Sequence, residues 1–185
     1  MALPMISAGH VASAPVELVL SEKVGLSGDS AKVTDAATGA LVFQIKAHLL
    51  TMSQRRELLD AAGNAIGQVR MKKSPGVHPA CYVGTMSDEK AVTIKLKGMM
   101  NPTKCDAEVI VGGTTVGEVT GNWRAKTAVI TIHGKEVARF KRSSLTANGI
   151  LFGADVYTIA ITAGFDTALA VLIASAFDEL YHDAP

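Results

Sequence analysis

The chain of 185 residues carries 18 Lys and Arg against 17 Asp and Glu, which gives a formal net charge of +1. This balance argues against a nucleic-acid-binding domain, because such domains usually need a strong basic excess. Hydrophobic residues make up 48% of the chain and charged residues 19%, which excludes a disordered polypeptide and predicts a substantial core. The length predicts a single domain, which we place at residues 16–185.

The N-terminal part of the sequence has the composition of a flexible arm. Residues 1–15 contain Ala, Pro and Ser without periodicity, so we expect them to lie outside the core. They lack the basic and apolar regions of a secretory signal, and Cys81 and Cys105 are too few for a disulfide framework. We therefore expect a reducing compartment, the cytoplasm, with peripheral membrane or nuclear locations as alternatives.

Between Val16 and Ile161, short runs rich in Val, Ile, Thr and Leu alternate with turn signals, a pattern typical of antiparallel strands. Within residues 91–97 the apolar side chains of Val92, Ile94 and Leu96 share one face, which predicts a half-buried strand. The run Glu136–Arg142 predicts a strand with a β-bulge, in which Val137 and Phe140 face inward. The clearest hairpin turns are expected at Asp35–Gly39, Asp60–Asn64, Gly112–Gly113 and His133–Gly134.

The last element breaks this β pattern and predicts a helix. Asp166 is a good N-cap residue, and almost three turns of apolar residues follow it, with Ser175 as the polar exception. The stretch is too short to span a membrane, which takes about 20 apolar residues. A helix that is apolar on all sides must be buried on all sides, so the strands must wrap it as a closed or nearly closed barrel. We expect its core side chains to include Leu169, Leu172, Ile173 and Phe177.

Six motifs follow one another along the chain: Val33–Phe43, Leu58–Asn64, Val69–Lys73, Gly121–Trp123, Phe152–Ile161 and Gly164–Glu179. Together with the apolar terminal helix, their order resembles the LURP-one-related family. That family has the tubby C-terminal-like fold, which it shares distantly with the tubby proteins and the phospholipid scramblases. The resemblance implies a mainly β protein, a closed antiparallel barrel of about twelve strands around a buried C-terminal helix. In this setting Trp123 is expected to anchor the barrel.

Basic strand residues are the candidates for a binding site. Relatives of the tubby type bind phosphoinositide headgroups through such residues, and several converging cations are what a phosphate cluster requires. Arg70 and Lys72 share one strand face, as do Arg139 and Lys141, so we predict that the four form one patch for an anionic headgroup. The alternative is that they are the solvated faces of amphipathic strands, which a net charge of only +1 favours.

The sequence carries no recognised catalytic motif, such as a nucleophile elbow, a phosphate-binding loop or a dinucleotide fingerprint. His78 and Cys81 have the spacing of metal ligands but supply two of the four that structural zinc needs. Residues 159–165 lack the acidic calcium segment of scramblase-type relatives, so calcium-dependent scrambling is not expected.

We therefore predict a non-enzymatic binding or scaffold module without a cofactor or metal. Its expected ligand is an anionic membrane surface, a phosphoinositide or a protein partner, with no nucleic acid and no transmembrane span. The alternative is a scramblase-like lipid-moving protein, or an enzyme that uses the mouth of the barrel as a pocket.

Overall fold

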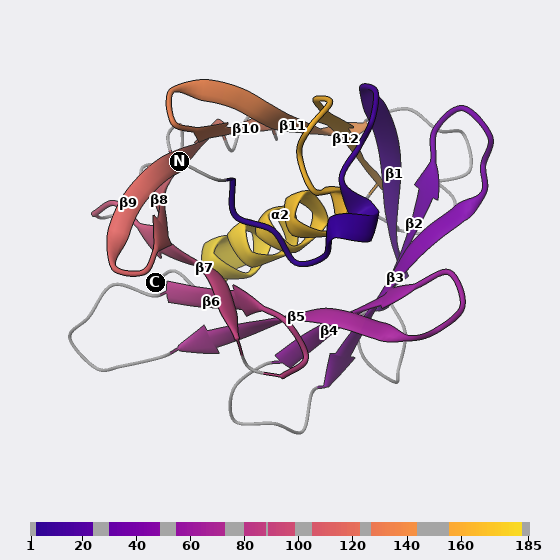
Figure 1. Cartoon of the computed structure of the whole chain (residues 1–185), viewed down its shortest axis with the longest axis horizontal. Helices are drawn as coiled ribbons and strands as arrows, with labels where there is room; N and C mark the ends of the chain where they lie inside the picture. Colours follow the sequence, from indigo (N-terminus) through magenta and orange to yellow (C-terminus); the bar gives the residue numbers. More distant parts are fainter. Residues whose placement is uncertain are drawn as a thin grey trace.

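The strands form one closed barrel, seen end-on in Figure 1. The computed structural model describes residues 3–23, 30–48, 55–72, 80–87, 89–98, 105–122, 127–143 and 156–182. In chain order the strands are β1 (Val16–Lys23), β2 (Ser30–Asp35), β3 (Leu41–His48), β4 (Arg55–Asp60), β5 (Ala65–Lys72), β6 (Ala80–Gly84), β7 (Lys90–Leu96), β8 (Cys105–Val111), β9 (Thr114–Asn122), β10 (Thr127–Ile132), β11 (Lys135–Ser143) and β12 (Val156–Ile161). Each strand pairs antiparallel with its neighbours in sequence, and β12 returns to pair with β1.

The four predicted turns all occur as hairpins between consecutive strands. At the β2–β3 turn, Asp35 Oδ1 accepts hydrogen bonds from the backbone N–H groups of Ala37 at 3.1 Å and Thr38 at 2.8 Å. It also accepts one from the Thr38 hydroxyl at 2.8 Å, and these bonds lower the pKa of Asp35. The turn therefore forms for the local reason that the sequence suggested, a short carboxylate bonding to its own backbone.

The predicted alternation of buried and outward residues is confirmed along the strands. Val92, Ile94 and Leu96 of β7 are buried, at 4% exposure or less. The predicted bulge lies between β10 and β11, where the register shifts between Ile130 and Thr131. Val137, Ala138 and Phe140 are accordingly all buried, because two consecutive residues of β11 turn their side chains inward.

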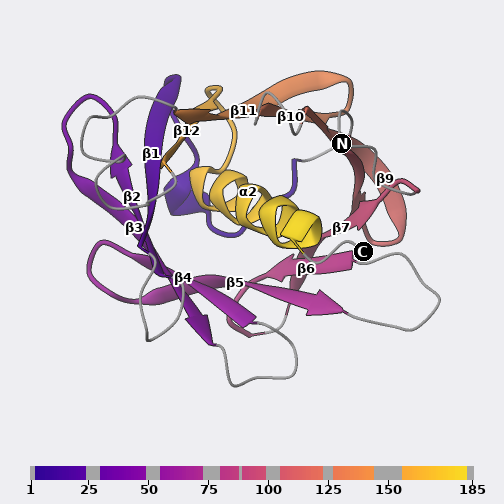
Figure 2. The same cartoon turned by 180° about the vertical axis from the view of Figure 1, so that it is seen from behind.

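The helix α2 (Thr167–His182) lies inside the ring of strands, as Figures 1 and 2 show from the two ends. Its predicted core residues are buried: Leu169, Leu172 and Ile173 are at most 1% exposed, and Phe177 is 5% exposed. The prediction of a barrel threaded by this helix is therefore confirmed. Trp123, the expected barrel anchor, lies outside the described residues.

The helix packs closely against β5 and β6. Gly67 of β5 makes this possible, because a Cβ atom at that position would lie 2.8 Å from Cδ1 of Leu172. The same Cβ would also lie 3.3 Å from the backbone oxygen of Gly84 on β6. A side chain here would push α2 away from this wall, so the glycine fixes how near the helix can come to it.

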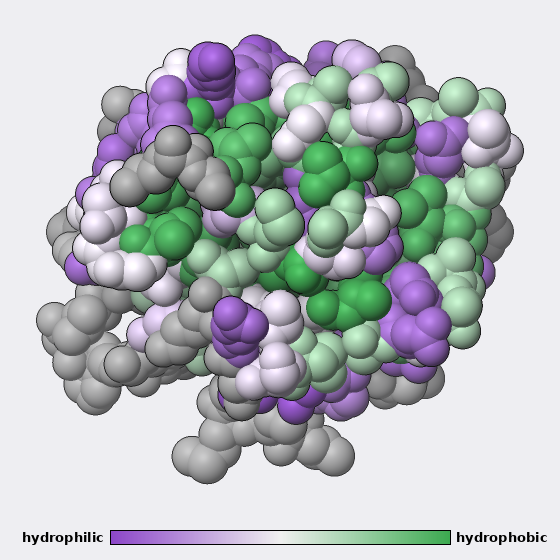
Figure 3. All heavy atoms as spheres, viewed as in Figure 1, coloured by the Kyte–Doolittle hydropathy of each residue, from purple (hydrophilic) through white to green (hydrophobic). Residues whose placement is uncertain are grey.

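Residues 3–15 differ from the expectation of an arm that stands apart from the core. They lie across the start of α2, with a short 3₁₀ helix η1 (Ala8–His10), and Leu3 and Ile6 pack against the core. Figure 3 shows hydrophobic residues gathered in the middle of this end of the molecule. The reason is a carboxylate that the sequence analysis assigned to the helix alone, that of Asp166.

Asp166 is 2% exposed and uses both carboxylate oxygens. Oδ1 accepts hydrogen bonds from the N–H groups of Ala168 at 2.8 Å and Leu169 at 3.3 Å, which makes Asp166 the predicted N-cap. Oδ2 accepts hydrogen bonds from Ile6 N–H at 2.6 Å and Ser7 N–H at 3.0 Å. One side chain thus caps the helix and holds the N-terminal segment over the end of the barrel.

The substitution Asp166→Ala should lower the free energy of unfolding by about 2–4 kcal/mol, because it removes a helix cap and two further hydrogen bonds to a buried charge. Urea denaturation measures this loss, and hydrogen exchange should show faster exchange at Ile6 and Ser7. Asp35→Ala is the matched control, since that carboxylate also accepts hydrogen bonds from backbone N–H groups but is solvent-exposed. An equal loss in the two variants would contradict this role for Asp166.

Candidate functional site

The four residues predicted as one anionic-headgroup patch do not lie together. Arg70 and Lys72 are on β5, whereas Arg139 and Lys141 are on β11. In the closed order of strands, β5 and β11 are separated by β6–β10 on one side and by β12 and β1–β4 on the other. The two pairs therefore lie on opposite sides of the barrel. The prediction that the four residues form one patch is wrong.

The β11 pair lies on the outer surface, where Arg139 and Lys141 are exposed. Arg139 is bonded to Glu136 of the same strand, with Nη2–Oε2 at 2.8 Å and Nε–Oε1 at 3.0 Å. This bidentate pair lowers the pKa of Glu136, chiefly through the hydrogen bonds from Arg139. The alternative interpretation, a solvated face of an amphipathic strand, fits the β11 pair.

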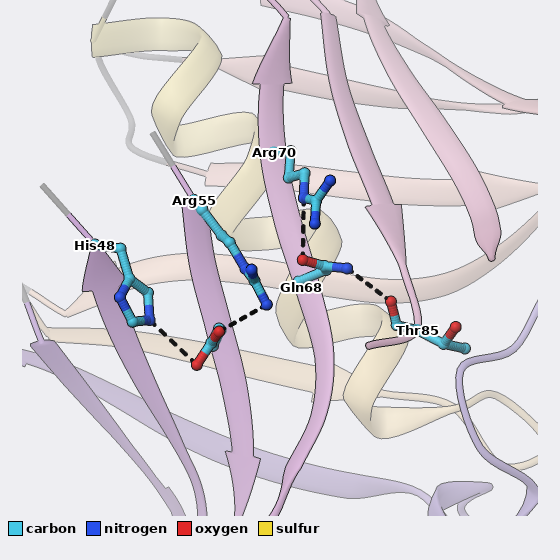
Figure 4. A network of polar contacts seen from close by, with 6 residues as sticks. His48, Arg55, Gln68, Arg70 and Thr85 are labelled. Atoms are coloured by element: carbon cyan, nitrogen blue, oxygen red, sulfur yellow. Dashed lines mark hydrogen bonds and ion pairs between the residues drawn. The ribbon is translucent and has the colours of Figure 1, made fainter. Parts of the chain in front are cut away.

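Of the β5 pair, Arg70 is part of a set of polar contacts on the outer faces of β3–β5 (Figure 4). Arg70 Nε donates a hydrogen bond to Gln68 Oε1 at 3.1 Å, and Gln68 Nε2 donates one to the backbone oxygen of Thr85 at 2.9 Å. Gln68 is 3% exposed, so these bonds hold the amide in a fixed orientation. The side chain of Lys72 lies outside the part of the chain that the structure describes.

Glu57 of β4 makes a second set of polar contacts beside the first, with β3 and with its own strand (Figure 4). Its Oε1 atom lies 2.7 Å from Arg55 Nη2, and its Oε2 atom lies 3.1 Å from His48 Nε2. Lys46 is the cross-strand neighbour of Glu57 on β3, and Gln68 is its neighbour on β5. One carboxylate therefore lies among several basic side chains.

We call the outer surface formed by Lys32, Lys46, Arg55 and Arg70 the basic face. Each residue comes from a different strand, β2 to β5 in order, and these four strands are consecutive in the barrel. Lys32 and Arg70 each lie between two buried residues, and Lys46 follows the buried Ile45. Arg55 precedes Arg56, which faces inward opposite Val69, so all four side chains point outward. In contrast, the outer surface of β8 and β9 carries Asp106, Glu108 and Glu118. The charge on the barrel is thus distributed unevenly around its circumference.

Arg56 is next to Arg55 in sequence but points into the barrel. Its cross-strand neighbour is Val69, which is buried, so both side chains face inward. Arg56 forms an ion pair with Glu179 of α2, and its Nη1 atom lies 3.4 Å from the Ser175 hydroxyl. The side chains of Arg56 and Glu179 are only 14% and 13% exposed. Arg56 is thus the partner of Glu179 near the end of α2.

A pocket lies beside this ion pair, between the C-terminal half of α2 and the barrel wall. Its empty volume is about 660 Å³ with the open mouth included, and about 50 Å³ of it can hold the centre of a water molecule. Apolar side chains from β1, β3, β11, β12 and α2 form most of its lining: Leu20, Ile45, Phe140, Ile159 and Phe177. The sequence analysis considered the mouth of the barrel as an alternative site. Of these five lining residues it named Phe140 and Phe177, and it assigned both to the core.

Within the described part of the chain, no helix has the length and apolar content needed to cross a membrane. Across the same residues, no three His, Cys, Asp or Glu side chains gather as metal ligands would. His78, considered above as a metal ligand, lies outside the described residues.

The architecture defines the class of protein, a closed antiparallel barrel filled by a C-terminal helix. The family model described as LURP-one-related matches residues 16–178, and the chain therefore belongs to the LURP-one-related family. The predicted family is thus confirmed.

Relatives and a solved structure agree with this assignment. The chain is 23% identical to Protein LURP-one-related 17 of Arabidopsis thaliana, over 78% of this chain and 74% of that protein. It is 24% identical to Protein LURP-one-related 8 of the same plant, over 80% of this chain and 78% of the relative. An X-ray structure of another Arabidopsis thaliana protein superposes with a TM-score of 0.67 at 18% identity and covers 96% of this chain and 98% of that one. This last likeness concerns the fold alone.

The ion pair between Arg56 and Glu179 should couple the helix end to β4. Arg56→Gln and Glu179→Gln should each destabilise the protein, because each leaves a largely buried charge without its partner. In a double-mutant cycle of unfolding free energies, we expect a coupling of about 1–3 kcal/mol.

The matched control is the same cycle at Glu136 and Arg139, whose side chains are 43% and 57% exposed. Solvent screens this pair, so its coupling should be much smaller and should fall further with added salt. Equal couplings in the two cycles would show that the Arg56 pair is not protected from solvent as the structure indicates.

Proposed function

We propose that this protein is a non-enzymatic binding module that docks on an anionic phospholipid surface through its basic face. The observation that carries the proposal is the alignment of Lys32, Lys46, Arg55 and Arg70 on four consecutive strands. A cluster of cations on one side of a protein attracts it to an anionic surface, at about 1 kcal/mol per Lys or Arg near the membrane.

The rest of the molecule supports a defined orientation on such a surface. Asp106, Glu108 and Glu118 lie on β8 and β9, away from the basic face, and Lys97, which follows β7, pairs with Glu118 at 2.8 Å, so the charges on that side of the barrel are more nearly balanced. The hydrogen bonds among Gln68, Arg70 and Thr85 hold part of the basic face in place before binding. Less side-chain entropy is then lost on docking.

Vesicle co-sedimentation tests the proposal with two sets of variants. The wild type should bind vesicles that contain anionic phospholipid and should not bind vesicles of phosphatidylcholine alone. The triple variant Lys32→Gln/Lys46→Gln/Arg70→Gln should lose about 100-fold in affinity, from roughly 1 kcal/mol for each cation. The variant Arg139→Gln/Lys141→Gln removes charge from the opposite side of the barrel and should bind nearly as the wild type does.

Salt gives a further criterion, because attraction between exposed charges weakens as ionic strength rises. Binding should therefore fall between low and high salt. Equal losses in the two sets of variants would indicate attraction by net charge without a defined face. Absence of binding to all vesicles at low salt would reject the membrane and leave a protein partner as the ligand to seek.

A further inference from the structure

The pocket beside α2 is a consequence of where the helix lies in the barrel. Gly67 lets α2 approach β5 and β6, and the helix is therefore not equally close to all strands. On the other side of its C-terminal half, the pocket is lined from β9–β12, β1, β3 and β4. Protein interiors are normally packed to the density of organic crystals, so an open apolar space against a central helix calls for an explanation.

The shape and walls of this space suit a narrow apolar group. Leu20 and Ile45 contribute aliphatic surface, and Phe140 and Phe177 meet edge to face with ring centroids 5.8 Å apart. The volume open to the centre of a water molecule is about 50 Å³, which is too small for a bulky ring system. Apolar walls with a few polar groups at one edge are the usual composition of a small-molecule site.

The polar edge of the pocket includes a cation that already has a partner. Arg56 contributes a positive charge, but it is already paired with Glu179, and Asp178 adds a further carboxylate to the lining. An anionic ligand would therefore meet a compensated cation and a carboxylate. A neutral head does not depend on a free cation and can bond to the hydroxyl group of Ser175, which also lines the pocket.

We infer that the pocket binds a neutral straight-chain amphiphile, with its alkyl chain between α2 and β11–β12 and its hydroxyl head at the polar edge beside Ser175 and Arg56. This inference is independent of the proposed docking on membranes, because the pocket lies inside the barrel and the basic face outside it. The ligand inside the barrel would be neutral, whereas the basic face on the outside attracts anions.

Binding of 1-alkanols of increasing length tests the inference, with isothermal titration calorimetry as the measurement. Each methylene buried contributes enough to tighten binding about fourfold, so affinity should rise steadily from hexanol to decanol. The carboxylate of the same chain length should bind at least tenfold more weakly than the alcohol at neutral pH. Equal affinity for the two heads, or no saturable binding of any alcohol, would overturn the inference.

A pair of variants locates the ligand. Ala174→Leu places a larger side chain at the pocket wall and should reduce decanol affinity at least tenfold. Ala160→Leu makes the same change on the exposed outer side of β12 and should have no effect. Loss of binding in both variants, or in neither, would contradict the proposed location.

Amide chemical shifts of the wild-type protein give a location that does not depend on how the variants fold. Decanol should shift the resonances of Leu20, Ala174 and Phe177, and the outer residues of β5 should stay unchanged. Shifts spread over the outer surface would overturn the inference. The variant Lys32→Gln/Lys46→Gln/Arg70→Gln should bind decanol as the wild type does, so failure of membrane docking and failure of this pocket can be told apart.

Discussion

The structure depends on burying a helix that is apolar on every side. Strands alone could form a sandwich, but a helix without a polar face needs contacts all around it, and a closed sheet supplies them. The requirement acts in both directions, because the inward faces of the strands also need an apolar partner at the barrel centre. Val33, Phe43 and Ile130 on the strands and Leu169 on the helix are all fully buried in one continuous cluster. The barrel and α2 therefore stabilise each other, and neither is a complete core alone.

Two local devices fix where the helix lies in this core. Gly67 removes a side chain where α2 comes nearest to the wall, and Asp166 ties the first turn of α2 to the N-terminal segment. At the other end, Glu179 is paired with Arg56 of β4. The helix is thus held at its start, at one side and near its end. The space left opposite β5 and β6 follows from this placement, which explains why the pocket lies there.

Sequence analysis predicted the features that depend on neighbouring residues and missed those that depend on position around the barrel. The turns at Asp35 and Asp60, the alternation in β7 and the N-cap at Asp166 are local, and all were predicted correctly. The patch of Arg70 and Arg139 required two strands to be neighbours, and alternation tells only whether a side chain points in or out. Their position around the barrel depends on how many strands lie between them, which in a closed order puts β5 and β11 on opposite sides.

The N-terminal segment and Arg56 show two other limits of the sequence. Nothing near residues 6–7 marks a partner, because their backbone N–H groups bond to a carboxylate about 160 positions away. In β4, the register shifts between Leu58 and Leu59, and both are buried, so simple alternation does not assign the faces of this strand. The cross-strand partner Val69 is what shows that Arg56 faces inward.

Strand β4 connects the two surfaces to which we assign binding. Arg55 belongs to the basic face, and the next residue, Arg56, lies at the polar edge of the pocket. Because consecutive residues of a strand point to opposite sides, one short segment serves both the outside and the inside of the barrel. Both residues lie near the end of the barrel where α2 finishes. The proposed docking through the basic face would therefore place Arg56, at the polar edge of the pocket, one residue away from Arg55 on the docking surface.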